Sequence, residues 1–595
     1  MDDYAVLTWR PGDPAADRPL AAARRTLAAM AWTIAGEQPG LEVWAPATDA
    51  PALFVSPGQD GLIVGRLFGA AEPAWRPHPV ACAEALCAAV WGRYAAVFRD
   101  PGGAATAVFR DPSGGLEALA WTCDGLAIVA SDLPGLLEAA PPADLAIDWR
   151  RIGAALADPI ALAGACPLAG VTTATPGALR PLDGGPEIPI WRPADFARRS
   201  LPDTAETRAG LVDAVDVAVS HLARPGGRAV AEVSGGLDSS IVASALVRVP
   251  SLEVAAWIHY FVDDAGADER RYARATARHL GLDLSEVPKA SFGLKLDGRA
   301  AAADGIRPSV ASADAHYDQD LAERCRRLGA TQIFSGLGGD TVFMQGGSPL
   351  LAADDYWNQP WRLDLGPALE IARHARRSVW SVWRAAQVSR FKPEPRPYRS
   401  ATGHLIDAAR APGRRDPPHP WMAGGRGVAP AKRRQMMHLA HQLLVTGRTA
   451  RGRQAQIVNP LLSQPVMETC LSLSARALTH GGDDRAMARQ AFRERLAPEV
   501  FARRSKGDLG RHYGRAIAED LDAVRGLLLD GALVGAGLVD PDKLDALLTP
   551  ETLIWKGPYR EVLDMVMLEQ WARSWSRRLA RLGRAPLAER LVEPA

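Results

Sequence analysis

The chain has 595 residues, a length that exceeds a single hydrophobic core and predicts roughly two to four domains. Hydrophobic residues make up 47% of the sequence and charged residues 23%, the balance of a folded globular protein rather than a disordered one. The net charge of +1 gives no general attraction to nucleic acid or to membranes, so we expect neither as a partner.

The cysteines and the chain start indicate a cellular compartment. The six cysteines form no C-x-x-C pair and no cluster with metal-ligand spacing, which is typical of reduced thiols. The first residues lack the basic and apolar regions of a signal peptide, and no apolar run approaches the roughly 20 residues that span a bilayer. We therefore expect a cytoplasmic protein.

The first third of the chain alternates short strands with Gly and Pro. Predicted strands are Gly61–Phe68, Tyr94–Phe98, Ala105–Phe109 and Leu126–Ala130, and two weakly helical pieces lie near Ala21–Met30 and Ala81–Trp91. This pattern predicts an α+β sandwich. The Gly- and Pro-rich stretch Asp183–Pro193 ends it, so we place a domain boundary between residues 1–190 and 191–595.

Beyond this linker, strands alternate with helices. The predicted strands are Ala229–Val233, Glu253–Ile258, Leu284–Val287 and Ala330–Phe334. The segment Asp203–Glu206 predicts a helix N-terminus whose capping box uses Glu206. Such alternation predicts an α/β doubly wound parallel sheet that binds ligands at the carboxyl ends of its strands, and the C-terminal part is predicted to be helical.

One stretch, A-V-A-E-V-S-G-G-L-D-S-S at residues 229–240, combines a strand, a glycine turn and a helix N-terminus. Glycines let the backbone approach a ligand, and free N–H groups and the helix dipole favour a phosphate. S-G-G-x-D-S is the signature of the ATP-pyrophosphatase loop, which holds pyrophosphate while ATP is cleaved between its α and β phosphates. An ordinary capped strand–turn–helix corner is the alternative, and the number of specified positions disfavours it.

A second glycine turn, S-G-L-G-G-D at residues 335–340, follows the strand Ala330–Phe334. A glycine turn with one carboxylate at the end of a strand suits a nucleotide together with a hard cation. Two such motifs in one predicted sheet favour a nucleotide site over two unrelated turns.

These motifs resemble those of asparagine synthetase-like amide-bond formers. Further matching segments are Gly92–Phe98, Phe109–Gly114, Ala130–Leu133, Thr175–Gly177, Ile457–Val466 and Arg503–Gly507. The resemblance implies a class II glutamine amidotransferase-like domain at residues 1–190 and an ATP-pyrophosphatase domain at residues 191–595.

The resemblance also implies roles for individual residues. Those implied to bind ATP are Val233, Ser234, Gly235, Gly236, Leu237, Asp238, Ser239, Ser240, Ile258, Ser335 and Gly336. Asp238 and Asp340 are implied to share Mg²⁺. Lys506 is implied to reach the α-phosphate and the acyl transition state, and a solvated surface lysine is the alternative.

The sequence departs from the family pattern at three places. The glutaminase nucleophile is a cysteine exposed after Met removal, whereas this chain has Asp2 there, so we expect no glutaminase activity. Arg110 and Asp111 are then expected to tie the sandwich together rather than to bind glutamine. Leu337 and Thr341 replace two glutamates of asparagine synthetases, which indicates a different acyl acceptor or nucleophile.

Lasso peptide cyclases are the members that resemble this chain best, because they also lack the cysteine and carry a segment like His419–Trp421. That resemblance implies an ATP- and Mg²⁺-dependent macrolactam closure in a precursor peptide, with a leader peptidase and a leader-binding partner. A small-molecule amide synthetase, β-lactam synthetase-like or ammonia-using, is one alternative, and a non-catalytic ATP-binding scaffold is another.

Two questions stay open in the sequence. The base that deprotonates the attacking amine is carried by no motif, and His316, Tyr317 and Glu499 are candidates only. The basic, Pro-rich segment at residues 390–434 suits either a solvated loop or a surface for a peptide or an acidic partner.

Overall fold

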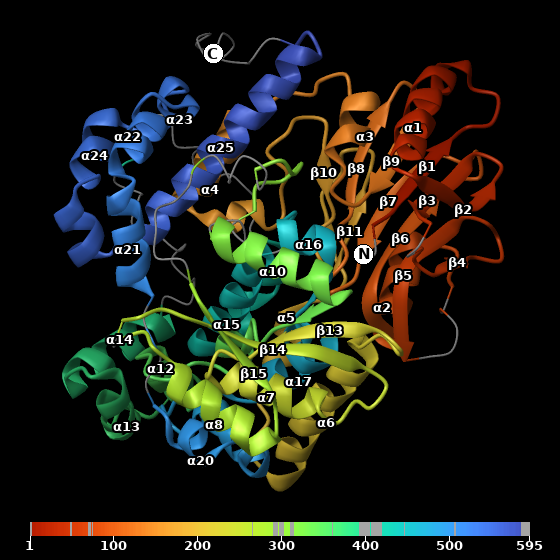
Figure 1. Ribbon diagram of the computed structural model, residues 1–595. Helices are drawn as coiled ribbons and strands as arrows, with labels where there is room; N and C mark the ends of the chain where they lie inside the picture. The colour runs from red at the N-terminus through yellow and green to blue at the C-terminus, as the bar shows by residue number, and fades with distance from the viewer. Residues whose placement is uncertain are drawn as a thin grey trace.

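The structure is a computed structural model of the chain (Figure 1). It describes residues 3–47, 50–69, 73, 75–264, 266–289, 296, 303–309, 314–359, 361–391, 405, 419–445, 447–504, 507 and 509–584. Most of the basic segment at residues 390–434, and Lys506, lie outside these ranges.

Two antiparallel sheets form the first part of the chain, drawn red to orange in Figure 1. The first, in the order β10-β8-β9-β1-β3-β2, consists of β1 (Ala5–Trp9), β2 (Trp32–Gln38), β3 (Leu41–Pro46), β8 (Leu119–Cys123), β9 (Leu126–Ala130) and β10 (Thr172–Thr173). The second, in the order β12-β11-β7-β6-β5-β4, consists of β4 (Leu53–Val55), β5 (Gly61–Gly69), β6 (Val90–Arg99), β7 (Ala105–Arg110), β11 (Ala178–Pro181) and β12 (Ile188–Pro189).

Alternating side chains of the two sheets pack against each other. Val6 and Val43 of the first sheet share a buried cluster with Val64 and Val97 of the second, as the two-residue period of a strand requires. The outer faces are covered by α1 (Asp17–Ala29) with α3 (Pro134–Ala139), and by α2 (Pro79–Ala89). The result is a four-layer α–β–β–α sandwich.

Arg110 and Asp111 hold this sandwich together. The Arg110 guanidinium donates to the carbonyl oxygens of Leu116 and Gly114 at 2.5 and 2.8 Å, and Asp111 accepts from the amides of Tyr94 and Ser113 at 3.1 and 2.8 Å. Both side chains are buried and occupied by the backbone of their own domain, in line with the expectation from sequence.

The second part contains a five-stranded sheet in the order β15-β14-β13-β16-β17, and every adjacent pair is parallel. Its strands are β13 (Arg228–Glu232), β14 (Glu253–Phe261), β15 (Leu284–Pro288), β16 (Gln332–Phe334) and β17 (Gln456–Val458). The predicted parallel sheet is confirmed. The chain moves outward in one direction from β13 and then returns to its other side at β16, so the topological switch point lies between these two strands.

Helices connect the strands and make up the C-terminal part, coloured blue in Figure 1. They are α4 (Trp149–Ala157), α5 (Pro193–Ala197), α6 (Ala205–Leu222), α7 (Leu237–Leu246), α8 (Arg270–Leu280), α10 (Ala315–Leu328), α11 (Gly339–Val342), α12 (Leu350–Asn358), α13 (Gly366–Ala375), α14 (Val379–Phe391), α15 (Pro430–Gln442), α16 (Ala450–Gln454), α17 (Gln464–Ser472), α18 (Ala475–Thr479), α19 (Ala486–Ala491), α20 (Pro498–Ala502), α21 (Gly510–Glu519), α22 (Leu521–Leu529), α23 (Ala532–Gly535), α24 (Pro541–Leu547) and α25 (Tyr559–Arg581). Within the described ranges, none of the helices is both long and apolar enough to cross a membrane.

One sequence prediction about these helices is wrong. The capping box of α6 does not use Glu206, because the helix begins at Ala205 and its third residue is Thr207. Thr204 is the N-cap, its hydroxyl accepts from the Thr207 amide at 3.1 Å, and the Thr207 hydroxyl accepts from the Thr204 amide at 2.9 Å. A threonine hydroxyl thus takes the place of the expected carboxylate.

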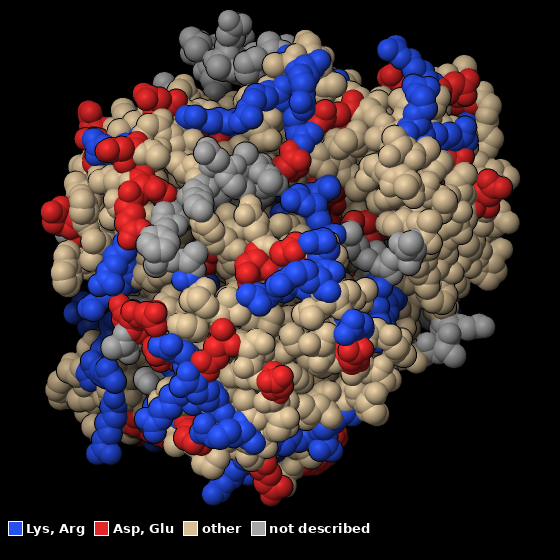
Figure 2. Space-filling model, viewed as in Figure 1, with Lys and Arg blue, Asp and Glu red and all other residues tan. Residues whose placement is uncertain are grey.

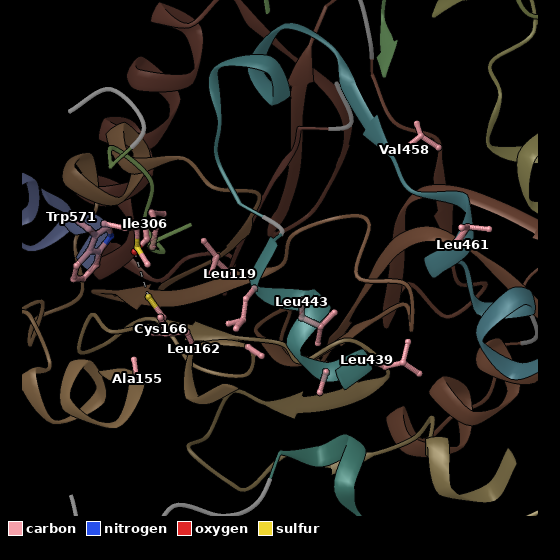
Figure 3. Packing of buried hydrophobic residues seen from close by; sticks show 14 of the residues in the cluster. Leu119, Ala155, Leu162, Cys166, Ile306, Leu439, Leu443, Val458, Leu461 and Trp571 are labelled. Atoms are coloured by element: carbon pink, nitrogen blue, oxygen red, sulfur yellow. Dashed lines mark hydrogen bonds between the residues drawn. The ribbon is translucent and has the colours of Figure 1, made fainter. Parts of the chain in front are cut away.

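A single hydrophobic cluster runs through both parts of the chain. Figure 3 shows members of this buried cluster from both parts, among them Leu119 of β8, Cys166, Ile306, Leu443 and Trp571 of α25. The sandwich and the parallel sheet therefore share a core, and each part buries apolar surface of the other.

This shared core predicts that the two parts unfold together. Trp571 is fully buried and its indole N–H donates to the Gly305 carbonyl at 3.1 Å. Trp571→Ala is expected to lower the free energy of unfolding by about 3–5 kcal/mol, and Trp571→Phe by less, because the ring is largely kept. Urea unfolding followed by circular dichroism measures both, and a separate early transition of the sandwich would contradict the shared core.

Candidate functional site

The two glycine turns lie side by side at the switch point of the parallel sheet. The turn 234–236 connects β13 to α7, and the turn 335–338 connects β16 to α11. Since β13 and β16 are paired and parallel, both turns leave the sheet at its carboxyl edge.

Glycine is required where the turns meet. A Cβ added to Gly336 would lie 2.4 Å from the Ser239 amide nitrogen, and one added to Gly339 would lie 2.2 Å from Cγ of Asp238. Gly235 adopts φ +79°, and its Cβ would lie 2.8 Å from the Ala273 nitrogen. The backbone of the second turn therefore rests directly on the first helical turn of α7.

Hydroxyl groups fix the conformation of both turns. The hydroxyls of Ser234 and Ser239 are 2.9 Å apart, and Ser239 also accepts from the Ser234 amide at 3.1 Å. Ser240 donates to the Gly236 carbonyl at 2.8 Å. The Ser335 hydroxyl donates to Asn459 Oδ1 at 2.8 Å, which joins the second turn to the segment after β17.

A cavity of about 420 Å³ opens between the turns. Its lining includes eight of the residues assigned from sequence: Ser234, Gly236, Leu237, Asp238, Ser239, Ser335, Gly336 and Asp340. Val233, Gly235, Ser240 and Ile258 are not among the lining residues. Val233 connects β13 to the first glycine turn. Its amide donates to the Ile258 carbonyl at 2.8 Å, and its carbonyl oxygen lies 2.9 Å from Nδ1 of the buried His259.

An arginine that the sequence analysis missed connects the two turns. Nη1 of Arg485 donates to Asp238 Oδ2 at 2.7 Å and also to Asp340 Oδ1, and Nη2 pairs with Asp484 at 2.8 Å. The arginine side chain is only 6% exposed. Burial works to lower its pKa, and the charges of Asp238, Asp340 and Asp484 outweigh burial and raise it, so Arg485 stays charged.

The two aspartates fit the Mg²⁺ assigned to them from sequence. Their carboxylate oxygens converge on one cationic nitrogen, and hard oxygen ligands are those that Mg²⁺ prefers. No group of three or more His, Cys, Asp or Glu side chains with ligand geometry occurs in the described part of the chain. Mg²⁺ in proteins is often bound by one or two carboxylates together with substrate phosphates, so the two aspartates fit such a site. The Arg485 guanidinium, which now lies between them, would have to move away for the ion to bind.

Described residues on both sides of Lys506 contact Glu269, which lines the same cavity. Lys506 itself lies outside the described residues, so its role stays a prediction. On either side of it, Arg503 pairs with Glu269 and the Gly507 amide donates to Glu269 Oε1 at 2.8 Å. Arg503 also donates to the Gly235 carbonyl at 3.2 Å, which holds this segment against the first glycine turn.

Of the three candidate bases, only Tyr317 lines the cavity. Its hydroxyl donates to Glu232 Oε1 at 2.7 Å, and burial together with the Glu232 charge raises the pKa of Tyr317 well above its usual range. The phenol therefore keeps its proton at neutral pH. His316 and Glu499 are not lining residues, and Glu499 pairs with Arg278 at 3.5 Å.

A second cavity, of about 220 Å³, lies between the sandwich and the parallel-sheet part. It shares Gln442, Ile457 and Asn459 with the first cavity, so the two spaces adjoin. Its apolar lining comes mainly from the second part of the chain: Leu222, Trp421, Leu439, Leu443, Leu462 and Met467.

The sequence analysis gave no role to four residues that line the site: Arg485, Arg503, Glu232 and Glu269, although Glu232 lies in the stretch 229–240 and Arg503 begins the segment Arg503–Gly507. None of the four lies within either glycine turn. Their distances along the sequence from those turns follow no helix or strand period that would have indicated a contact. Arg485 follows Asp483–Asp484 and adopts φ +50°, a conformation that sequence alone does not predict for arginine.

A comparison with protein families places the chain. A family model described as asparagine synthase matches residues 210–573, which contain both glycine turns, Arg485 and the Arg503–Gly507 segment. No curated protein matches the chain.

The contacts of Arg485 predict a competition with metal. Arg485→Gln removes the cation between Asp238 and Asp340, so Mn²⁺ is expected to bind about tenfold or more tightly without nucleotide. The electron paramagnetic resonance signal of free Mn²⁺ measures this affinity. Arg495→Gln, which removes the pair with Asp216 outside the cavity, is the matched control. Equal Mn²⁺ affinity of Arg485→Gln and wild type would show that Arg485 does not occupy the metal position.

Proposed function

Because the chain belongs to the asparagine synthase family and is therefore an ATP-dependent, amide-forming ligase, we propose that it closes a macrolactam within a ribosomal precursor peptide. The activated group is the side-chain carboxylate of an Asp or Glu of the peptide. The attacking group is the N-terminal amine of the core peptide, and the products are the cyclic peptide, AMP and pyrophosphate.

The convergence of Asp238 and Asp340 at the switch point carries this proposal. The glycine backbone of the turn 234–236 and the N-terminus of α7 suit the β and γ phosphates. Mg²⁺ bound by the two aspartates would neutralise phosphate charge. Lys506 is assigned to the α-phosphate, where one fixed cation is worth roughly 3–4 kcal/mol as charge develops.

The reaction balances in two steps. A carboxylate oxygen of the peptide attacks the α-phosphorus, the bond from that phosphorus to pyrophosphate breaks, and an acyl-adenylate forms. The peptide amine then attacks the acyl carbon, AMP leaves with the electron pair of its bond, and the amine loses a proton. Holding both peptide groups in one site makes the second step effectively unimolecular.

We propose that the carboxylate of Glu232 accepts the proton that the amine loses. Asp238 and Asp340 pair with Arg485, and Glu269 pairs with Arg503, whereas Glu232 accepts a hydrogen bond from Tyr317. A protonated Tyr317 orients the carboxylate and cannot itself act as the base.

A peptide substrate explains the departures from asparagine synthetases. Leu337 lines the cavity in place of an acidic group, and the side chain of Thr341 is engaged by Gln442 Nε2 at 3.1 Å. The adjoining cavity, which has Leu439, Leu443 and Met467 among its lining residues, suits polypeptide side chains better than free aspartate or ammonia. The sandwich would then be an amidotransferase-like scaffold without a nucleophile, kept because it completes the shared core.

This activity implies partners and a location. We propose a leader peptidase and a leader-binding protein as companions, with no nucleic acid or membrane partner, in the cytoplasm. A small-molecule amide synthetase uses the same ATP site, and the identity of the AMP-linked product separates it from the peptide ligase.

Asp238→Asn tests whether the site is catalytic. The expected result is loss of AMP formation and of peptide dehydration by roughly 100-fold or more, because one of the two charges that hold the cation is removed. The assay combines the purified protein, ATP, Mg²⁺ and a linear core peptide, and mass spectrometry follows the loss of one water. Asp283→Asn, at an exposed position between α8 and β15, is the matched control. Undiminished cyclisation by Asp238→Asn would favour the non-catalytic scaffold.

Glu232→Gln separates the two chemical steps. Pyrophosphate exchange into ATP, which reports adenylation, is expected to stay within about threefold of wild type, while macrolactam formation slows roughly 100-fold. Glu253→Gln, at the opposite end of the parallel sheet, serves as the control. Equal slowing of both steps would assign Glu232 to nucleotide binding instead of amine deprotonation.

A further inference from the structure

Helix α14 is apolar on two opposite faces. Val382 and Ala386 are buried, and Val379 and Trp383 pack with them against a separate hydrophobic cluster formed with α12 and α13. This inner face accounts for the position of the helix on the molecule. It does not account for the apolar residues on the other side.

The outer face exposes large apolar side chains to solvent. Trp380 is 66% exposed, Val388 46% and Phe391 72%, and the exposed Arg384 lies between them at positions i, i+4, i+8 and i+11. These four residues, here called the α14 stripe, follow one side of the helix because of its 3.6-residue period. Exposed aromatic and apolar side chains in a row mark an interaction surface.

Unpaired arginines surround the α14 stripe. Arg373, Arg376 and Arg377 precede Trp380 and are exposed. Neither they nor Arg384 form an ion pair with any carboxylate of the described ranges. Figure 2 shows Lys and Arg side chains over the corner of the molecule that α13 and α14 occupy in Figure 1. A partner with carboxylates complements this charge.

We propose that the α14 stripe docks an acidic, apolar segment of a partner protein. Arg384 in the middle of the stripe favours a protein over a membrane. A lipid-binding helix keeps its cations at the margins of a broad apolar face, whereas a central arginine must meet a carboxylate once it is buried. Tryptophan and arginine are also the residues that contribute most at protein interfaces.

One of the arginines that precede the α14 stripe lines a cavity next to the nucleotide site. Arg377 lines a space of about 370 Å³ whose lining also includes Asp340, one of the two aspartates of that site. The docking surface does not depend on which substrate the ligase uses.

The test measures binding of a fluorescein-labelled synthetic helix with leucines on one face and glutamates at its margins. A matched peptide has glutamine at every glutamate. Fluorescence anisotropy with the full chain is expected to show binding of the glutamate peptide, with an affinity that Arg384→Glu lowers tenfold or more. Trp380→Ala/Phe391→Ala is expected to do the same. Arg248→Glu, an exposed arginine just after α7, is the control, and melting temperatures verify folding.

Four results would overturn the proposal. These are no binding of the glutamate peptide, equal binding of the glutamine peptide, and equal loss in Arg248→Glu. The fourth is binding of phosphatidylserine-containing vesicles, or self-association in analytical ultracentrifugation, that depends on the α14 stripe while the peptide does not bind. A peptide with lysine at every glutamate would support the proposal if it bound the Arg384→Glu variant more tightly than wild type, because the charges of peptide and protein are then exchanged.

Discussion

The close approach of two glycine turns is the constraint on which the functional site depends. Gly336 and Gly339 place the backbone of the second turn against Asp238 and Ser239, at distances that no side chain would allow. Only this contact brings Asp340 within reach of the cation that Asp238 also binds. The parallel pairing of β13 with β16 makes the contact possible, since it sends both turns out of the same edge of the sheet.

The pairing of charged side chains then determines which carboxylates of the cavity are neutralised by arginine. Its carboxylates are close enough to repel one another, and two arginines that arrive from the helical part of the chain, Arg485 and Arg503, neutralise three of them. Buried like charges without such partners would be costly. Glu232 accepts a hydrogen bond from Tyr317 and also interacts with the charge of Arg451, and we propose it as the carboxylate that takes the proton.

Shared packing joins the sandwich to the ligase part of the chain. The buried cluster that joins Leu119 and Cys166 to Trp571 crosses from the first part of the chain to its last long helix. Losing the sandwich would expose that apolar surface. Arg110 and Asp111 hydrogen-bond to the backbone inside the sandwich, and these contacts hold it together.

Local patterns in the sequence determined the strands, the parallel sheet, both glycine turns and the lining role of Asp238 and Asp340, because period and turn chemistry act over a few neighbouring residues. The same reasoning placed the capping box of α6 on Glu206, where a one-residue shift of the helix start gave it to Thr207. The contacts of Arg485, Arg503 and Glu232 became visible only in the folded chain. Apart from Asp484, which pairs with the neighbouring Arg485, their partners are more than eighty residues away, and no local pattern encodes contacts over such separations. The sequence by itself determined a parallel sheet with a glycine turn after two of its strands, and it predicted a nucleotide site at that edge. Tertiary structure alone decided which charges meet there.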